Sequence, residues 1–135
     1  MTYLLDTTMF SALMRRQTKI RARIAAIAPT DHAAVCTITR GEVLYGLARL
    51  PQGKRRSDLE VEANHLFAQL ACLSLPEAVG DRYAQIKWEA ERTGTPLDEN
   101  DLWIAATALV VNAVLVTTDS DFRRVSSLRV EDWTQ

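Results

Sequence analysis

The sequence is poor in cysteine and histidine. Its 135 residues include two cysteines, Cys36 and Cys72, and neither belongs to a CxxC pair. Both lie in apolar stretches, which favours buried free thiols in a cytoplasmic protein. A disulfide between them is possible, but their spacing does not support it. His32 and His65 have no metal-ligand spacing, so we do not expect a histidine base.

Long apolar segments are scarce, and the charges nearly balance. The formal net charge is −1, so a nucleic-acid partner has to be held by local cationic patches. Asp6 interrupts the first apolar stretch, so we expect no signal peptide. The longest apolar run, residues 102–116, is short for a membrane span and is interrupted by Thr107 and Asn112. It predicts a buried helix, a turn and a strand in a protein that does not enter a membrane.

What the sequence does contain is an alternation of short apolar segments and helical patterns. It predicts an α/β protein with a mostly parallel sheet, in a single domain over residues 1–135. The expected strands are residues 3–5, 33–37, 73–75, 114–117 and 128–130. The expected helices are residues 7–14, 19–28, 39–50, 54–70, 76–93 and 98–112.

Acidic residues stand beside four of these apolar segments. Asp6 and Asp119 follow predicted strands, so both should lie at the carboxyl edge of the sheet, where such folds bind ligands. Glu42 and Asp101 lie in the first turns of predicted helices. Gathering these carboxylates is costly unless protons or a cation neutralise them. Carboxylate oxygens are the ligands that Mg²⁺ and Mn²⁺ prefer.

Each acid also has a structural interpretation. Glu42 stands three residues after Thr39, which is the spacing of a helix capping box. Asp6 can favour a helix N-terminus through its charge, and Asp98 is more typical of an N-cap than of a ligand. Residues 119–121 can form a simple turn. These interpretations stay open for each acid taken alone.

Four blocks of sequence, in order, resemble those of a PIN-domain protein. They are residues 4–13, 39–46, 100–106 and 116–122, and the similarity continues to residues 128–133. Within that superfamily the chain resembles a VapC-type toxin of a bacterial type II toxin–antitoxin system. The resemblance implies a three-layer α/β/α fold, an acidic Mg²⁺ site and endoribonuclease activity. It also implies inhibition by a small cognate VapB-like antitoxin, a homodimer and a toxin–antitoxin hetero-oligomer.

The resemblance also singles out particular residues. Asp6, Glu42, Asp101 and Asp119 match the metal-site acids of the family, and Thr117 matches a polar residue near that site. We expect Asp6 and Asp119 to contact the metal ion directly, with Glu42 and Asp101 holding waters or a second ion.

Three positions depart from the family pattern or match it only loosely. Thr8 stands where many relatives carry Asn or Ser, and Asp98 stands where close relatives often carry Gly. Asp121 matches an acidic position that the family keeps less strictly. We expect Asp98 and Asp121 to have at most a supporting role around the metal-site acids.

Several cations are candidates for binding RNA phosphates. Arg123 and Arg124 flank the Asp119 turn, while Arg15 and Lys19 share a face with Arg23 if their helix is continuous. A further basic cluster occupies residues 54–56. Such contacts give salt-dependent affinity with little sequence preference.

Three alternatives to an endoribonuclease remain. A haloacid dehalogenase-like phosphatase also places an aspartate after its first strand, but it needs a second aspartate where this chain has Thr8. A PIN-like module that binds RNA or a protein without cleavage is the non-enzymatic alternative. A purely structural α/β domain with unremarkable acids is a further one.

Overall fold

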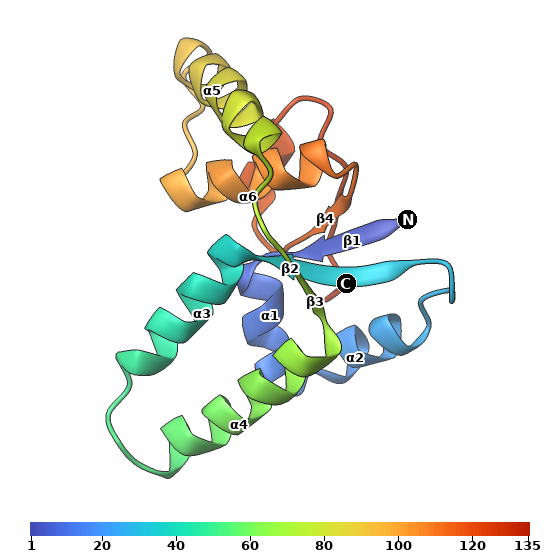
Figure 1. Ribbon diagram of the computed structural model, residues 1–135, viewed down its shortest axis with the longest axis vertical. Coiled ribbons are helices and arrows are strands. Elements are labelled where there is room, and N and C mark those ends of the chain that lie inside the picture. The colour runs from blue at the N-terminus through green and yellow to red at the C-terminus, as the bar shows by residue number, and fades with distance from the viewer.

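The computed structural model describes residues 1–135 and contains one five-stranded sheet. All strand pairs are parallel, and the strand order is β3-β2-β1-β4-β5 (Figure 1). The strands are β1 (Thr2–Leu5), β2 (His32–Cys36), β3 (Ala71–Leu73), β4 (Val114–Val116) and β5 (Val130–Glu131). The predicted α/β class and parallel sheet are confirmed.

Helices cover both faces of the sheet. Figure 1 shows α5 and α6 on one side and α1 to α4 on the other, so the fold has the three expected layers. The helices are α1 (Thr7–Met14), α2 (Thr18–Ala25), α3 (Thr37–Ala48), α4 (Lys54–Gln69), α5 (Glu77–Arg92) and α6 (Glu99–Val110). A 3₁₀-helix, η1 (Ser120–Arg124), precedes β5. None of the helices combines the length and the apolarity that a membrane crossing needs.

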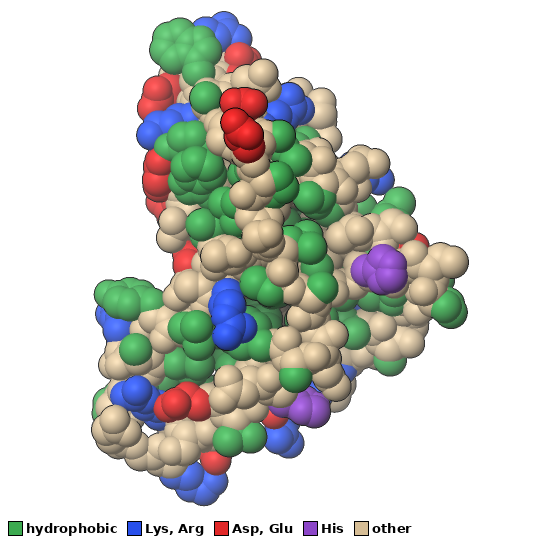
Figure 2. Space-filling model, viewed as in Figure 1, with side chains coloured by type: hydrophobic (Ala, Val, Ile, Leu, Met, Phe, Trp, Pro, Cys, Tyr) green, Lys and Arg blue, Asp and Glu red, His purple; other side chains and the backbone are tan.

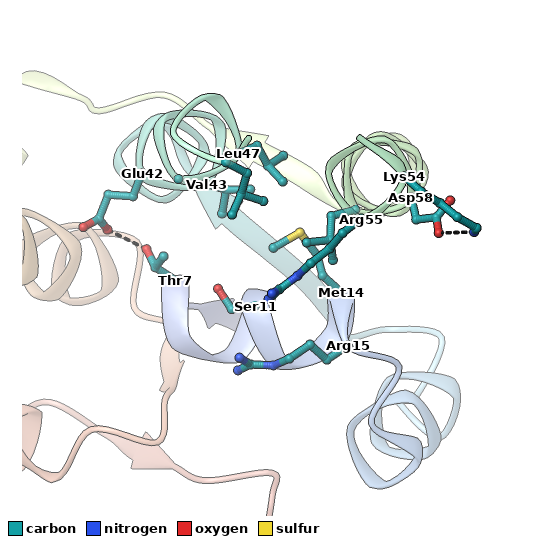
Figure 3. Close-up of a pocket in the computed structure, with 13 residues that line it drawn as sticks. Thr7, Ser11, Met14, Arg15, Glu42, Val43, Leu47, Lys54, Arg55 and Asp58 are labelled. Carbon is teal, nitrogen blue, oxygen red and sulfur yellow. Dashed lines mark hydrogen bonds and ion pairs between the residues drawn. The ribbon is translucent and has the colours of Figure 1, made fainter. Parts of the chain in front are cut away.

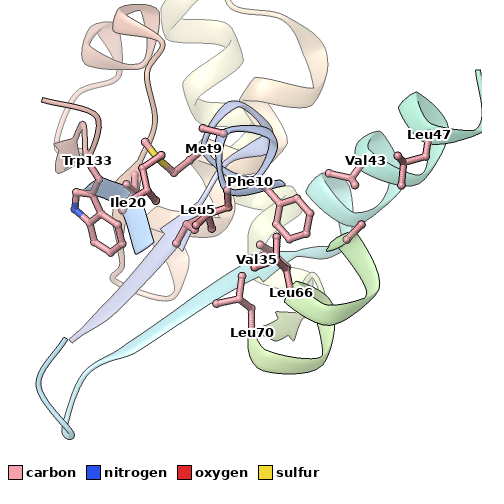
Figure 4. Close-up of a cluster of buried hydrophobic side chains, with 14 residues drawn as sticks. Leu5, Met9, Phe10, Ile20, Val35, Val43, Leu47, Leu66, Leu70 and Trp133 are labelled. Carbon is pink, nitrogen blue, oxygen red and sulfur yellow. The ribbon is translucent and has the colours of Figure 1, made fainter. Parts of the chain in front are cut away.

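The two-residue period of the strands divides the core between the two faces. Leu5, Val35 and Val116 point toward α1 and α4, where they pack with Phe10 and Leu66 (Figure 4). The intervening strand residues Leu4, Ala34, Cys36 and Leu115 pack on the opposite face with Ile104 of α6. Both faces are therefore apolar, as expected for a parallel sheet buried by helices.

The order of the strands creates a switch point beside β1. The chain builds β1, β2 and β3 toward one edge and then crosses over to place β4 against the other side of β1. The carboxyl ends of β1 and β4 are thus adjacent, with Leu5 paired with Val116. Such a switch point is where open α/β sheets form their ligand sites.

The structure corrects two expectations about residue environments. Cys36 is buried, but Cys72 is exposed, because β3 is an edge strand with one open side; both thiols are free. The chain breaks its helix between Met14 and Thr18, so the cations at 15, 19 and 23 do not share one continuous helix face. The run over residues 102–116 does form a helix, a turn with positive φ at Asn112, and a strand.

Candidate active site

The site is centred on Asp6, which directly follows β1 at the switch point. Its backbone N–H donates to the Val116 carbonyl of β4 over 3.1 Å, so the two strand ends are tied together there. The Asp6 side chain is only 2% exposed. A carboxylate so deeply buried has to be compensated by hydrogen bonds or by positive charge.

Three hydrogen bonds hold the Asp6 carboxylate. Oδ1 accepts from the Met9 backbone N–H at 2.9 Å and from the Thr8 hydroxyl at 2.7 Å. Oδ2 accepts a short bond from the Thr117 hydroxyl. A carboxylate has about four acceptor positions. One lone pair on Oδ2 therefore remains for a water or a cation.

Asp6 combines this geometry with the structural role foreseen for it. It is the N-cap of α1, since its side chain accepts from the Met9 N–H three residues on. Burial raises the Asp6 pKa, while the Thr117, Met9 and Thr8 hydrogen bonds lower it and repulsion from Asp119 raises it again. The N-cap contact fixes the orientation of the Asp6 carboxylate. The raised pKa means that these hydrogen bonds do not fully offset the cost of burying its charge.

The hydroxyls of Thr8 and Thr117 connect Asp6 to the Asp119 segment. The Thr117 hydroxyl accepts from the Asp119 N–H at 3.0 Å, and the Thr8 hydroxyl accepts from the Thr118 N–H at 3.2 Å. Each threonine thus donates to Asp6 and accepts from the loop after β4. Asp119 itself caps η1 by accepting from the Asp121 N–H at 2.9 Å. The turn expected at residues 119–121 is present and coexists with the approach of Asp119 to Asp6.

Glu42 is held by two residues that were not among the expected site residues. Its Oε1 accepts from the Thr7 hydroxyl at 2.5 Å, and its Oε2 accepts from the Asn100 amide at 3.3 Å. These contacts join α1, α3 and α6 at one carboxylate. The only indication of their role in the sequence is that each is next to a predicted site acid: Thr7 follows Asp6, and Asn100 precedes Asp101.

The capping-box interpretation of Glu42 is wrong. Helix α3 begins at Thr37 with Cys36 as its N-cap, so Thr39 already lies inside the first turn. The Thr39 hydroxyl is buried without a hydrogen-bond partner. Glu42 is therefore free to reach α1 and α6 rather than its own helix terminus.

The pKa of Asp101 reflects the negative charge concentrated at this edge of the sheet. Burial, and after it repulsion from other carboxylates, raises the pKa of Asp101 to about 7. In decreasing order these carboxylates are Asp119, Asp98, Glu42 and Asp6. Asp101 is therefore close enough to Asp6, Glu42 and Asp119 to be repelled by each of them.

The donors of this site fit a hard divalent cation. They are carboxylate and hydroxyl oxygens, with no histidine or cysteine among them, which suits Mg²⁺ or Mn²⁺ rather than zinc or copper. No three acidic, histidine or cysteine side chains come close enough to grip one ion together. Mg²⁺ tolerates such an open site, because it keeps several waters and takes only one or two carboxylates.

Asp98 and Asp121 lie at the margin of this site. Asp98 is the N-cap residue of α6, as expected, but its side chain makes no capping hydrogen bond. Asp121 forms an ion pair with Arg124 at 3.1 Å. Arg124 also donates to the Pro96 carbonyl at 3.3 Å, so its guanidinium is committed within the chain. Arg123 is exposed, and no ion pair engages it.

The face of the molecule shown in Figure 2 has no large patch of one charge. On the face shown in Figure 2, basic and acidic side chains are interspersed, and the two histidines lie apart. Both histidines are exposed, and neither belongs to a group of side chains that could hold a metal ion. This agrees with the net charge of −1 and leaves nucleic-acid binding to individual cations.

The comparisons with known proteins agree with this architecture. The PIN domain model matches residues 3–128, so the chain belongs to the PIN-domain family. Within that family it is of the VapC type. It is 32% identical to ribonuclease VapC1 of Haemophilus influenzae, with 100% of both chains covered. It is 29% identical to the tRNA(fMet)-specific endonuclease VapC of Salmonella typhimurium, over 97% of each chain.

A solved structure gives the same result for the fold. VapBC-1 from nontypeable Haemophilus influenzae superposes with a TM-score of 0.89 at 30% identity, covering 100% of both chains. Nucleases with a PIN domain generally depend on a divalent metal ion. The carboxylate and hydroxyl oxygens at the switch point are donors of the kind that Mg²⁺ and Mn²⁺ prefer.

Proposed function

We propose that this protein is a Mg²⁺-dependent endoribonuclease toxin that a cognate VapB-like antitoxin neutralises in the cytoplasm. The observation that carries the proposal is the set of mutually repelling carboxylates at the switch point, with Asp101 shifted to a pKa of about 7. The relatedness to VapC ribonucleases over the whole chain supports RNA as the substrate. Mn²⁺ is the expected substitute for Mg²⁺.

In this proposal Asp6 and Asp119 bind the metal ion directly, and Glu42 and Asp101 hold its waters or a second ion. The free Oδ2 lone pair of Asp6 supports the first assignment, because only one position on that carboxylate is left for a ligand. Thr117 and Thr8 fix the Asp6 carboxylate, and Thr7 and Asn100 fix Glu42. A bound divalent cation supplies polarisation of the phosphoryl oxygens and a more acidic water for in-line attack.

The partners follow from the same relationship. VapBC-1 is similar to this chain along its full length, which supports an antitoxin partner and a toxin–antitoxin hetero-oligomer here. A homodimer of the toxin is part of the proposal. A short neighbouring reading frame whose product co-purifies with this chain is the expected biochemical sign.

The phosphatase alternative is weakened by the contacts of Thr8. Its hydroxyl donates to Asp6 and accepts from the Thr118 N–H, so it serves as a structural bridge. No acid stands where that chemistry needs a second aspartate. A binding module without cleavage stays the alternative that experiment has to separate.

The proposal is tested by mapping RNA ends. Total RNA is incubated with the protein in Mg²⁺, in Mn²⁺ and in EDTA, and new 5′ ends are sequenced. We expect discrete cleavage sites with either metal and none in EDTA, because phosphodiester attack needs the cation. RNA that stays intact with both metals, at protein concentrations where it is bound, would support the non-cleaving alternative.

Asn100 provides a second test of the site. Replacing it by alanine removes the amide donor that holds Glu42 at 3.3 Å. One hydrogen bond to a charged group contributes about 1.5 kcal/mol, so we expect cleavage to fall roughly tenfold. The rate is measured on an RNA that the wild type cuts, with Asn64→Ala on the exposed face of α4 as the control. Equal rates for both variants would show that Glu42 needs no support from α6.

A further inference from the structure

A groove of about 780 Å³ runs from the acidic site between α1, α3 and α4 (Figure 3). Thr7 and Glu42 line its end at the site, and Lys54 and Asp58 line its far end. Between them the wall carries Ser11, half-buried on α1, and several apolar side chains. A ligand lying in this groove therefore reaches the Glu42 carboxylate, which is the part of the acidic site that lines it.

Two arginines enter the groove from different elements. Arg15 follows α1 and Arg55 lies in the first turn of α4, and both line the groove. Figure 3 shows Arg55 reaching across to Ser11 and Arg15 running back along α1. Neither guanidinium has an ion-pair partner, although the residues on both sides of Arg55 do. Lys54 pairs with Asp58 at 2.7 Å, and Arg56 pairs with Glu60 at 2.9 Å.

This arrangement is unfavourable without an anion. Two guanidinium groups on one groove repel each other, and Arg55 also stands at the positive end of the α4 dipole. The nearest carboxylate on α4, Asp58, is already paired with Lys54. Guanidinium groups match the oxygens of a phosphate in two-pronged contacts, and a serine hydroxyl adds a further donor.

The distance between Ser11 and the acidic site indicates which phosphate of an RNA strand the arginines can bind. Ser11 is four residues beyond Thr7 on the same helix, which places it about 6 Å further along the axis. That is about the step between neighbouring phosphates in an extended single strand. Ser11 therefore lies about one nucleotide step beyond Thr7, whose hydroxyl contacts the Glu42 carboxylate.

We propose that Arg15, Arg55 and Ser11 form a binding site for the RNA phosphate next to the one that is cleaved. The proposal rests on the proposed endoribonuclease function and adds a defined contact to it. Because the contacts are to the backbone, the site positions the strand and carries no base specificity. Single-stranded RNA suits it, because a single strand can follow a groove lined with separate cations.

The test measures RNA binding and RNA cleavage separately in Arg15→Gln and Arg55→Gln proteins. Binding of a fluorescent single-stranded RNA is followed by anisotropy in EDTA, where no cleavage occurs. We expect each substitution to weaken binding roughly fivefold to tenfold, and to reduce the slope of log affinity against log salt by about 0.7. In Mg²⁺, we expect KM to rise by a similar factor while kcat stays within about threefold.

Lys54→Gln is the matched control. It removes the same charge from the same turn of α4, but this lysine is already paired with Asp58. Its RNA affinity should stay within about twofold of the wild type. Equal weakening in Lys54→Gln would mean that the groove attracts RNA only through its overall charge, and would overturn the specific site.

Two further outcomes separate the inference from the function on which it rests. Unchanged RNA affinity in both arginine variants overturns the phosphate site, whether or not the wild type cleaves RNA. If those variants instead lose affinity for a poly-glutamate peptide, the arginines bind protein carboxylates and the phosphate assignment is wrong. If the wild type binds RNA through the arginines but never cuts it, the phosphate site stands and the nuclease proposal fails.

Discussion

Replacing Asp101 by asparagine is expected to lower RNA cleavage on the order of a thousandfold while the fold stays intact. The substitution keeps the size of the side chain but removes a negative charge. That charge is unfavourable in the metal-free protein because it is partly buried and is repelled by the neighbouring acids. Burial, and repulsion from Asp119 before the other acids, raise the pKa of Asp101 to about 7. Without metal, the variant should therefore be at least as stable as the wild type at pH 8. Cleavage rates, with circular dichroism to verify the fold, test both expectations.

Asp98→Asn is the control for that experiment. Asp98 stands one turn earlier, also repels Asp101, and makes no capping hydrogen bond. Removing it should change cleavage by less than about threefold, because it touches none of the other site residues through a hydrogen bond. Wild-type activity in Asp101→Asn would remove Asp101 from the site. A large loss in Asp98→Asn would extend the site to the N-terminus of α6.

The positions of Asp6 and Asp119 could be predicted because they depend on strand ends alone. Each follows a short apolar strand, and parallel strands bring their carboxyl ends to the same edge of the sheet. The same local reasoning misjudged Glu42. A shift of two residues in the start of α3 removes the capping box, and helix boundaries are the least certain part of a sequence pattern.

Contacts between elements that are distant in the chain could not be predicted from the sequence. Glu42 meets Thr7 and Asn100 only because α1, α3 and α6 converge at the switch point, and nothing in their local patterns encodes that meeting. The exposure of Cys72 has a similar cause. Its apolar neighbours suggested burial, but β3 occupies the edge of the sheet, a place set by the strand order of the whole fold.

Magnesium is expected to stabilise the protein strongly at pH 8 and weakly at pH 5. In the absence of metal, the folded state holds a proton on Asp101 up to about pH 7, whereas the unfolded chain releases it near pH 3.8. Stability therefore falls as the pH rises between those values, and Asp6, whose pKa is also raised, adds to the same trend. Glu62 and Asp132, whose pKa values are lowered, act in the opposite direction, but only below the range from pH 5 to 8.

A divalent ion binds only the deprotonated carboxylates, so its effect grows over this same range. At free Mg²⁺ a hundred times its Kd, the stabilisation is about 2.7 kcal/mol, which raises the Tm of a chain of this size by about 10 °C. Thermal melts at pH 5 and pH 8, in Mg²⁺ and in EDTA, measure the difference. Asp101→Asn should lose most of the Mg²⁺ effect, while Asp81→Asn, an exposed acid on α5, should keep it. An equal Mg²⁺ effect at both pH values would mean that the ion binds elsewhere, because only a site of proton-holding carboxylates couples metal and proton in this way.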